Sequence, residues 1–197
     1  MSKPLEFFFD FGSPTAFLAF KRLPALVERT GAQVTYTPIL LGGLFKAVGN
    51  QPPATVPNKG KWLFEDLQRW AAKYETPFKF NPNFPVNTLP LMRGACAMQL
   101  DEPTRFLEYC EACFNGMWVD IMNLNDMGEI GKLLQTKGFD AQALAQRIGD
   151  SEVKEVLKSN TARAAELGLF GAPTFLVDGE LHWGQDRMDW VEAALQR

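Results

Sequence analysis

The first forty residues alternate between short apolar runs and one stretch with helical spacing. Leu5–Phe11 is apolar, rich in aromatic residues and bounded by a glycine, which predicts a buried strand. Apolar residues recur at helical spacing from Phe17 to Val27, and Pro24 is expected to kink or interrupt this helix. Gln33–Thr37 alternates and favours a second strand. A strand, a helix and a strand in this length predict a βαβ unit with parallel strands.

The middle of the chain has a different pattern. Gly49–Gly60 is rich in proline, glycine and asparagine and predicts a long loop, and Phe80–Pro90 predicts another. The pattern over Trp62–Tyr74 predicts a helix, and from Leu91 to Leu167 the pattern is helical throughout. Breaks in this long helical stretch are expected near Asn115, Asn125 and Gly138.

The end of the chain returns to strand signals. Thr174–Val177 and Glu180–Trp183 flank the pair Asp178-Gly179, which is compatible with a type I′ turn and predicts a hairpin. Asp186–Leu195 predicts a closing amphipathic helix, with Asp186 as its N-cap.

These elements predict an α/β protein. The outer parts combine into a four-stranded mixed sheet with flanking helices, which is the thioredoxin-like arrangement, and an all-helical subdomain interrupts it. The expected division places residues 1–45 and 168–197 in the thioredoxin-like domain. Residues 46–167 form the loop-rich and helical insertion.

Composition narrows the possible functions. A chain of 197 residues is long enough for one sizeable core, and its net charge of −3 comes from interspersed acids and bases. This balance gives no electrostatic case for nucleic acid or an anionic membrane as a partner. No apolar run approaches the length of a membrane span, and Asp10 interrupts the first apolar run before it resembles a signal peptide. Three cysteines do not suggest a disulfide framework, so a cytoplasmic, reducing compartment is expected.

The turn after the first strand carries the sequence Ser13-Pro14-Thr15-Ala16. Ser13 is a favourable N-cap, and Pro14 suits the first helical position, where a missing N–H costs nothing. In a thioredoxin arrangement, redox proteins place Cys-x-x-Cys here, because the helix N-terminus favours a thiolate. The absence of cysteine at this turn excludes disulfide chemistry there.

Ser13 therefore has two interpretations. The simpler one is a helix cap worth about 1 kcal/mol. In the other, its hydroxyl and the adjacent N–H groups bind a thiolate that a ligand brings. Ser13 is a poor nucleophile itself, because serine needs a base and the only histidine, His182, lies in the terminal hairpin.

Five short segments occur along the chain in a set order: FDFGSPTAFLA, GNQPPATVPNKGKW, FPVNTLPLMRG, GAPTF and WGQDRM. GAPTF alone would fit many thioredoxin relatives, whereas the five in this order are more specific. Together they resemble the 2-hydroxychromene-2-carboxylate isomerases, relatives of kappa-class glutathione transferases in the DsbA-like branch of the thioredoxin superfamily. The resemblance covers essentially the whole chain.

The resemblance implies that glutathione is a cofactor whose sulfur lies at the first helix, stabilised as a thiolate by Ser13 in a catalytic role. The implied glutathione-binding residues are Ser13, Pro14, Thr15, Asn50, Lys59, Ala172, Pro173, Gln185 and Asp186. Pro173 is expected in cis, with the Ala172 backbone pairing with the extended tripeptide. Lys59 would pair with a carboxylate, and Gln185 stands where relatives often have serine.

Two further residues are implied contacts of the organic substrate. Lys46 and Asn87 would contact its carboxylate and its hydroxyl. Simpler interpretations remain open for several of these residues: solvation for Lys59, capping for Asp186 and an ordinary edge position for Pro173.

A literal Cys-x-x-Cys occurs at Cys110 and Cys113, within a helical stretch and not after a strand. Cysteines at this spacing on one helix face are more often buried packing residues, and the same is expected of Cys96. With one histidine in the chain, a zinc site lacks ligands, so no metal is expected.

The implied function is a glutathione-dependent isomerase that interconverts 2-hydroxychromene-2-carboxylate and trans-o-hydroxybenzylidenepyruvate. Its ligands would be glutathione and a small aromatic carboxylate, and the family expectation is a homodimer. Two alternatives remain: a kappa-like glutathione transferase, whose sulfur adduct leaves as product, and a non-catalytic thioredoxin-like binding domain.

Overall fold

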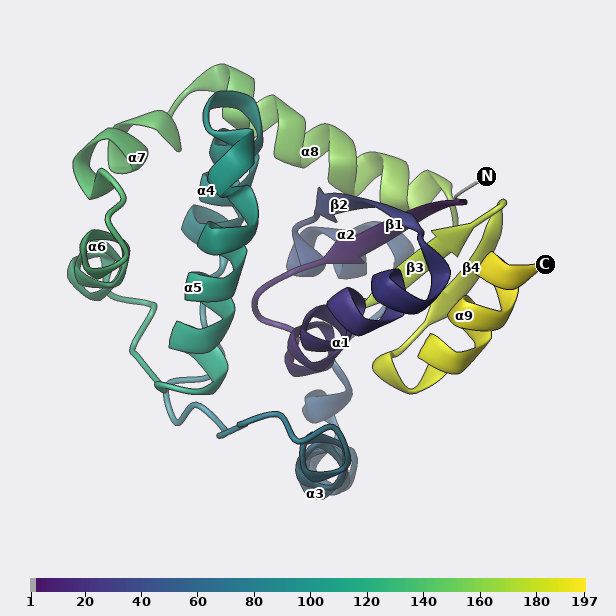
Figure 1. Cartoon of the computed structure of the whole chain (residues 1–197). Coiled ribbons are helices and arrows are strands. Elements are labelled where there is room, and N and C mark those ends of the chain that lie inside the picture. The colour runs from purple at the N-terminus through teal and green to yellow at the C-terminus, as the bar shows by residue number, and fades with distance from the viewer. Residues whose placement is uncertain (1–2) are drawn as a thin grey trace.

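The computed structural model describes residues 3–197 and contains a four-stranded mixed sheet in the order β2-β1-β3-β4 (Figure 1). The strands are β1 (Pro4–Phe9), β2 (Gln33–Pro38), β3 (Thr174–Val177) and β4 (Glu180–Trp183). β1 runs parallel to β2 and antiparallel to β3, and β3 pairs antiparallel with β4. The predicted βαβ unit, the terminal hairpin and the thioredoxin-like α/β fold are therefore confirmed.

Helices cover both faces of this sheet. The helices are α1 (Pro14–Thr30), α2 (Leu41–Val48), α3 (Pro57–Lys73), α4 (Leu89–Asp101), α5 (Phe106–Trp118), α6 (Met127–Thr136), α7 (Ala141–Arg147), α8 (Ser151–Glu166) and α9 (Met188–Gln196), and the 3₁₀ turns are η1 (Pro53–Thr55), η2 (Pro103–Arg105) and η3 (Gln185–Arg187). Helices α1 and α9 pack together on one face, and α2 and α8 pack together on the other (Figure 1). Helices α4 to α7 lie beside the β2 edge.

The long stretch from α4 to α8 is helical, as predicted. The division into residues 1–45 with 168–197 and residues 46–167 stays a prediction. Helix α8, from the second part, packs on β2 of the first part and on α2, which crosses the predicted boundary.

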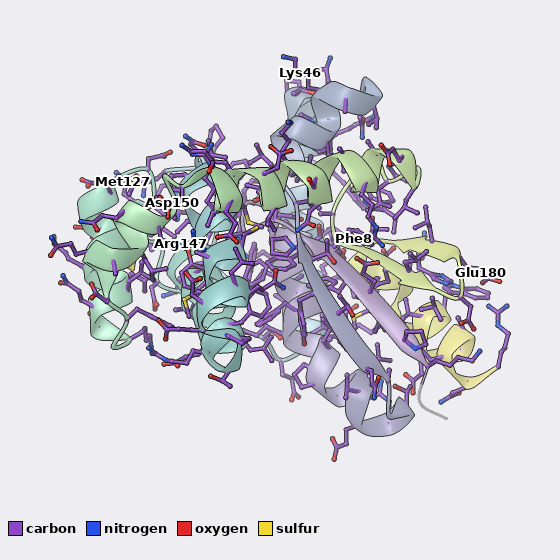
Figure 2. The ribbon with its side chains drawn as sticks, turned by 90° about the horizontal axis from the view of Figure 1, so that it is seen from above. Phe8, Lys46, Met127, Arg147, Asp150 and Glu180 are labelled. Carbon is purple, nitrogen blue, oxygen red and sulfur yellow. The ribbon has the colours of Figure 1, made fainter. Side chains whose placement is uncertain are left out.

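Apart from Pro4 and Glu6, β1 is buried on both sides because it lies in the middle of the sheet. Phe7 and Phe9 face the larger core and stack on each other with ring centroids 5.5 Å apart. Phe8 points to the opposite face, where it packs in a smaller core with Ile39 and Leu44 (Figure 2). A central strand of this kind has apolar side chains in succession and no polar face, which explains the aromatic run at the start of the chain.

The first strand and the first helix differ in detail from the prediction. β1 ends at Phe9, two residues early, because the Asp10 carboxylate accepts a hydrogen bond from the Gly12 N–H at 2.8 Å and turns the chain. Pro24 does not interrupt α1, which is one helix over 17 residues. The buried side chains of Leu23 and Leu26 hold this region against the core and outweigh the one hydrogen bond that proline removes.

The predicted loop over Gly49–Gly60 is wrong in its last part. Helix α3 starts at Pro57, so Lys59 lies in the first turn of a helix. Proline at a first helical position is a recognised start signal, but the surrounding prolines and glycines obscured it. The short helix α2 was not predicted, because its Gly42 and Gly43 weaken the helical signal.

Two other predictions are wrong. Asn115 does not break a helix but lies inside α5, where its side-chain amide donates to Glu111 at 2.9 Å. Asp186 does not cap the last helix. It lies in η3 and pairs with Arg187 at 3.3 Å, and α9 begins only at Met188. The expected breaks near Asn125 and Gly138 are confirmed.

Within residues 3–197, no helix is both long and apolar enough to cross a membrane.

The ion pair between Glu6 on β1 and Arg163 on α8 gives a testable prediction. Both carboxylate oxygens of Glu6 accept from Arg163 at 2.7 Å, and Glu6 also accepts from Thr37. Burial raises the pKa of Glu6, but the hydrogen bonds from Arg163 and Thr37 outweigh it and leave the pKa below its usual value. The pair therefore contributes stability above the unfolded-state pKa, and this stability is lost as pH falls through the lower folded-state pKa.

We expect Glu6→Gln to lower the free energy of unfolding by about 1 kcal/mol at pH 7, a value kept small because Arg163 is half exposed. Urea unfolding between about pH 7 and pH 3 should also show a weaker loss of stability in acid for this variant. Glu155→Gln, in the exposed pair with Lys158, is the matched control and should change little. Equal unfolding curves for Glu6→Gln and wild type would contradict the prediction.

Candidate functional site

Ser13 occupies the N-cap of α1, at the end of the turn that follows β1. Its backbone is extended, and its hydroxyl oxygen accepts a hydrogen bond from the Ala16 N–H at 3.1 Å. Pro14 follows at the first helical position, as predicted. The next N–H, that of Thr15, has no acceptor among residues 3–197. This helix end therefore keeps a free donor beside the Ser13 hydroxyl.

The Ser13 hydroxyl also reaches the segment before β3. It donates to the carbonyl oxygen of Ala172 at 2.8 Å, and the Thr15 hydroxyl donates to the same oxygen at 3.2 Å. The two hydroxyl oxygens lie 2.9 Å apart. Ser13 is buried and Thr15 is half-buried, so Thr15 is the more accessible of the two.

The hydroxyl oxygens of Ser13 and Thr15 and the carbonyl oxygen of Ala172 form a cluster, here called the Ser13 cluster, that can rearrange its hydrogen bonds. A serine hydroxyl has one proton, so it cannot donate to Ala172 and to an incoming anion at the same time. If the Ser13 hydroxyl turns to an anion, the Thr15 hydroxyl can still pair with the Ala172 carbonyl. The cluster can therefore exchange partners without leaving a buried carbonyl unpaired.

The Ala172–Pro173 peptide bond is cis, as expected from the sequence. The Pro173 carbonyl accepts from the Gly184 N–H at 3.0 Å, which brings the end of β4 to this position. The N–H of Ala172 has no acceptor within the described part of the chain, and its carbonyl is already engaged by Ser13. Ala172 thus offers an extended peptide its N–H, whereas its carbonyl is shared within the protein.

Asn50 lies directly after α2 and is held close to the same segment. Its side-chain amide donates to the Phe170 carbonyl at 2.7 Å, and its side-chain oxygen accepts from the Gln51 N–H at 2.8 Å. An open hollow of about 490 Å³ lies here, lined by Val48, Gly49, Asn50, Gly168, Leu169 and Phe170. Only Gly171 separates Phe170 from Ala172, so Asn50 is near the Ser13 cluster.

Gln185 and Asp186 lie in η3, which packs against α1. Gln185 is buried, and its carbonyl oxygen accepts from the Tyr74 hydroxyl at 3.2 Å. Tyr74, at the end of α3, thereby ties this helix to η3, a contact that nothing in the sequence indicated. Burial raises the pKa of Tyr74 to about 12, with Asp186 adding to the rise and the nearby Arg22 opposing it.

The structure does not bring Lys46, Lys59 or Asn87 into contact with Ser13. Lys46 is exposed on the part of α2 that projects beyond α8 (Figure 2), and Lys59 is exposed on α3. Asn87 is exposed and its side-chain oxygen accepts from the Leu89 N–H at 3.2 Å, at the start of α4. The roles of these residues stay predictions, as do the ligand contacts of Ser13, Pro14, Thr15, Asn50, Ala172, Pro173, Gln185 and Asp186.

The cysteines lie on helices of the predicted insertion and not at the turn of Ser13. Cys96, Cys110 and Cys113 are free and buried on α4 and α5, as the sequence predicted. Burial raises the pKa of Cys113 to about 12, which keeps its thiol protonated and unreactive. Within residues 3–197, no group of three or more His, Cys, Asp and Glu side chains is placed to hold a metal ion.

Comparison with known proteins finds matches over almost the whole chain. The family model for the DSBA-like thioredoxin domain matches residues 4–196. The chain is 32% identical to a 2-hydroxychromene-2-carboxylate isomerase of Sphingobium xenophagum, over 99% of each protein. It is 28% identical to glutathione S-transferase kappa 1 of Rattus norvegicus, over 94% of this chain and 87% of the relative.

A solved structure of a 2-hydroxychromene-2-carboxylate isomerase matches with a TM-score of 0.88 and 28% identity, covering 98% of this chain and 95% of that one. The similarity therefore extends over the sheet, the helices and the turn that carries Ser13. The chain belongs to the DSBA-like thioredoxin domain family, in the group of 2-hydroxychromene-2-carboxylate isomerases and kappa-class glutathione transferases.

Proposed function

We propose that this protein is a glutathione-dependent isomerase of the 2-hydroxychromene-2-carboxylate type, which takes a small aromatic carboxylate as its substrate. The observation that carries the proposal is the hydroxyl of Ser13 at the amino end of α1, next to the Ala172–Pro173 segment and with no cysteine in the turn. The isomerases that match along almost the whole chain support the isomerase activity, and the kappa-class transferases support the use of glutathione.

The residues at this site suit glutathione. The N–H of Thr15 and the hydroxyl of Ser13 are donors that a thiolate can accept, and the helix N-terminus favours negative charge. The N–H of Ala172 is a donor for an extended tripeptide backbone. Gln185 and Asp186 have polar side chains for the γ-glutamyl group, and Asn50 and Lys59 are the proposed contacts nearer its other end.

Bound glutathione supplies a thiolate nucleophile that is released unchanged after the isomerisation. The protein holds that sulfur and orients the substrate against it, which are effects of positioning and electrostatics. Ser13 donates its proton to the sulfur in a hydrogen bond, and Thr15 keeps the Ala172 carbonyl paired. Lys46 and Asn87 are the proposed contacts of the substrate carboxylate and hydroxyl. A homodimer in the cytoplasm is the proposed form of the enzyme.

The second candidate function is a glutathione transferase, because kappa-class transferases also match along the chain. The same thiolate site serves both reactions, and they differ in whether the sulfur adduct leaves as product. A non-catalytic thioredoxin-like binding domain is the third possibility, and it requires no glutathione binding.

The first prediction from the proposed function concerns Ser13. Calorimetric titration should show that glutathione binds to wild type and to Ser13→Ala. The ultraviolet absorbance of the bound thiolate should show a lowered thiol pKa only in wild type. We expect the variant to raise this pKa by about one to two units, or about 1.4 kcal/mol per unit, because it loses one hydrogen bond to the thiolate.

Ser151→Ala, at the start of α8, is the matched control and should keep the wild-type value. If wild type fails to bind glutathione, the cofactor proposal is wrong and Ser13 is only a helix cap.

A second prediction tests the exchange of hydrogen bonds. Thr15→Val keeps the side-chain shape but removes the hydroxyl that pairs with Ala172. We expect it to raise the bound thiol pKa by about half a unit, because the Ser13 hydroxyl is then held more firmly by the carbonyl. Thr15→Ser retains the hydroxyl and should behave like wild type. Identical titrations for the two Thr15 variants would rule out the exchange.

A third prediction separates the isomerase from the transferase. With the isomerase substrate, the free thiol concentration should be unchanged after many turnovers, because glutathione is regenerated. A thiol assay before and after the reaction measures this directly. Loss of one thiol per turnover would support the transferase instead.

A further inference from the structure

Asp10 is a buried carboxylate to which the proposed reaction assigns no role. It lies in the turn between β1 and Ser13, with 1% of its surface exposed. One carboxylate oxygen accepts from the Gly12 N–H and the other from the Leu41 N–H, each at 2.8 Å. The Thr88 hydroxyl is a further donor to this carboxylate. Burying an ionised carboxylate costs free energy unless hydrogen bonds compensate for the lost water, and these donors supply that compensation.

The bond to Leu41 completes the start of α2. This helix has Leu40 at its N-cap, and Leu40 has no side chain able to accept from the first N–H groups. The carboxylate of Asp10, from a different segment, accepts from Leu41 at the first helical position. The side chain of Asp10 therefore accepts a hydrogen bond from the first turn of α2, as the side chain of Ser13 does from the first turn of α1. Asp10 and Ser13 lie in the same turn, so this turn joins the starts of the two helices.

The remaining contacts of the turn reach the helical part of the molecule. The N–H of Phe11 donates to the Met92 sulfur on α4 at 3.4 Å, and the Trp118 indole N–H donates to the Phe11 carbonyl at 2.8 Å. These contacts fix the turn in place but do not involve α2. Asp10 is thus the residue of this turn whose side chain accepts a hydrogen bond from α2, and this bond links α2 to the turn that carries Ser13.

The other end of α2 is also held near the site. Asn50 follows the helix and donates to Phe170, two residues before Ala172. Helix α2 is therefore attached at its start to the turn that carries Ser13 and at its end to the segment that carries Ala172. Lys46 and Asn50, two proposed ligand contacts, lie on or directly after this helix.

We propose that Asp10 is a positioning residue, whose buried carboxylate fixes the start of α2 against the turn of Ser13 and so holds Lys46, the proposed substrate contact on α2, in a set position relative to the sulfur at Ser13. This inference rests on the proposed function. Asp10 acts through other residues, because its buried side chain is not accessible to a ligand. Burial raises the pKa of Asp10, and the hydrogen bonds from Leu41, Gly12 and Thr88 oppose that rise.

The test removes the Leu41 N–H without changing Asp10. Leu41→Pro suits this purpose, because proline fits the first position of a helix and the preceding Leu40 is already extended. Leu41→Ala is the matched control, since it shortens the same side chain and keeps the N–H. We expect Leu41→Pro to lower kcat/KM for the aromatic substrate about fivefold relative to Leu41→Ala. The pKa of the bound glutathione thiol should stay the same in both, because the bond from Gly12 to Asp10 remains.

Asp10→Asn provides the second arm. The amide has one oxygen, so its NH₂ group must face either the Gly12 N–H or the Leu41 N–H, donor against donor. We expect kcat/KM to fall about tenfold or more. Adding Leu41→Pro to Asp10→Asn should cause no further loss, because the proline removes the opposing N–H. All rates are referred to the folded fraction, measured by thermal unfolding of each variant.

The outcomes separate the two proposals. If wild type does not bind glutathione, the proposed function fails, and the inference that depends on it falls with it. If wild type binds glutathione and turns over, but Leu41→Pro matches Leu41→Ala, only the role of Asp10 is wrong. The role of Asp10 is also wrong if the losses of kcat/KM caused by Asp10→Asn and Leu41→Pro multiply in the double variant. It is wrong too if the loss disappears once the rates are corrected for the folded fraction.

Discussion

The double pairing of β1 is the constraint on which the site depends. β1 pairs with β2 on one side and with β3 on the other, so the turn after β1 and the segment before β3 meet at the same end of the sheet. Ser13 and Ala172 are 159 residues apart in the chain, yet their hydroxyl and carbonyl oxygens lie 2.8 Å apart. Every proposed contact of the sulfur follows from this meeting of two segments.

The site keeps the electrostatic part of a thioredoxin-like centre and lacks its redox part. The amino end of α1 still presents a free N–H at Thr15 and favours negative charge. A serine in place of the first cysteine can donate to a sulfur but cannot form a disulfide. The protein's own thiols are buried in the helical part, where a raised pKa keeps Cys113 unreactive. A sulfur at this helix end must therefore come from a ligand.

The helical part also supports the turn that precedes Ser13. Met92 on α4 and Trp118 on α5 bond to the two backbone groups of Phe11. Thr88 lies so close to Gly12 that a Cβ added there would stand 3.1 Å from the threonine methyl group. A side chain at this position would therefore have to displace Thr88 by a few tenths of an ångström, and the turn is fixed by elements far along the chain. Rigid support of this kind is what a positioned thiolate needs.

Local sequence signals predicted the elements whose cause is local. The aromatic run of β1, the Ser13-Pro14 helix start and the Asp178-Gly179 hairpin were all correct, because each depends on neighbouring residues. Two of the errors arose where distant contacts decided the outcome. Pro24 stays helical because the core holds Leu23 and Leu26, and α2 forms despite two glycines because Asp10 and α8 support it.

The fold class, the absence of disulfide chemistry at the turn and the polar residues available for a ligand could all be predicted from the amino-acid sequence. These depend on residue type and order, which are visible in the chain. Three contacts became visible only in the folded protein: Thr15 shares the Ala172 carbonyl with Ser13, Tyr74 binds the Gln185 carbonyl, and Asp10 joins α2 to the turn. Two of these contacts join residues more than a hundred positions apart and the third spans 31, and all depend on how helices pack around the sheet, which no local pattern encodes.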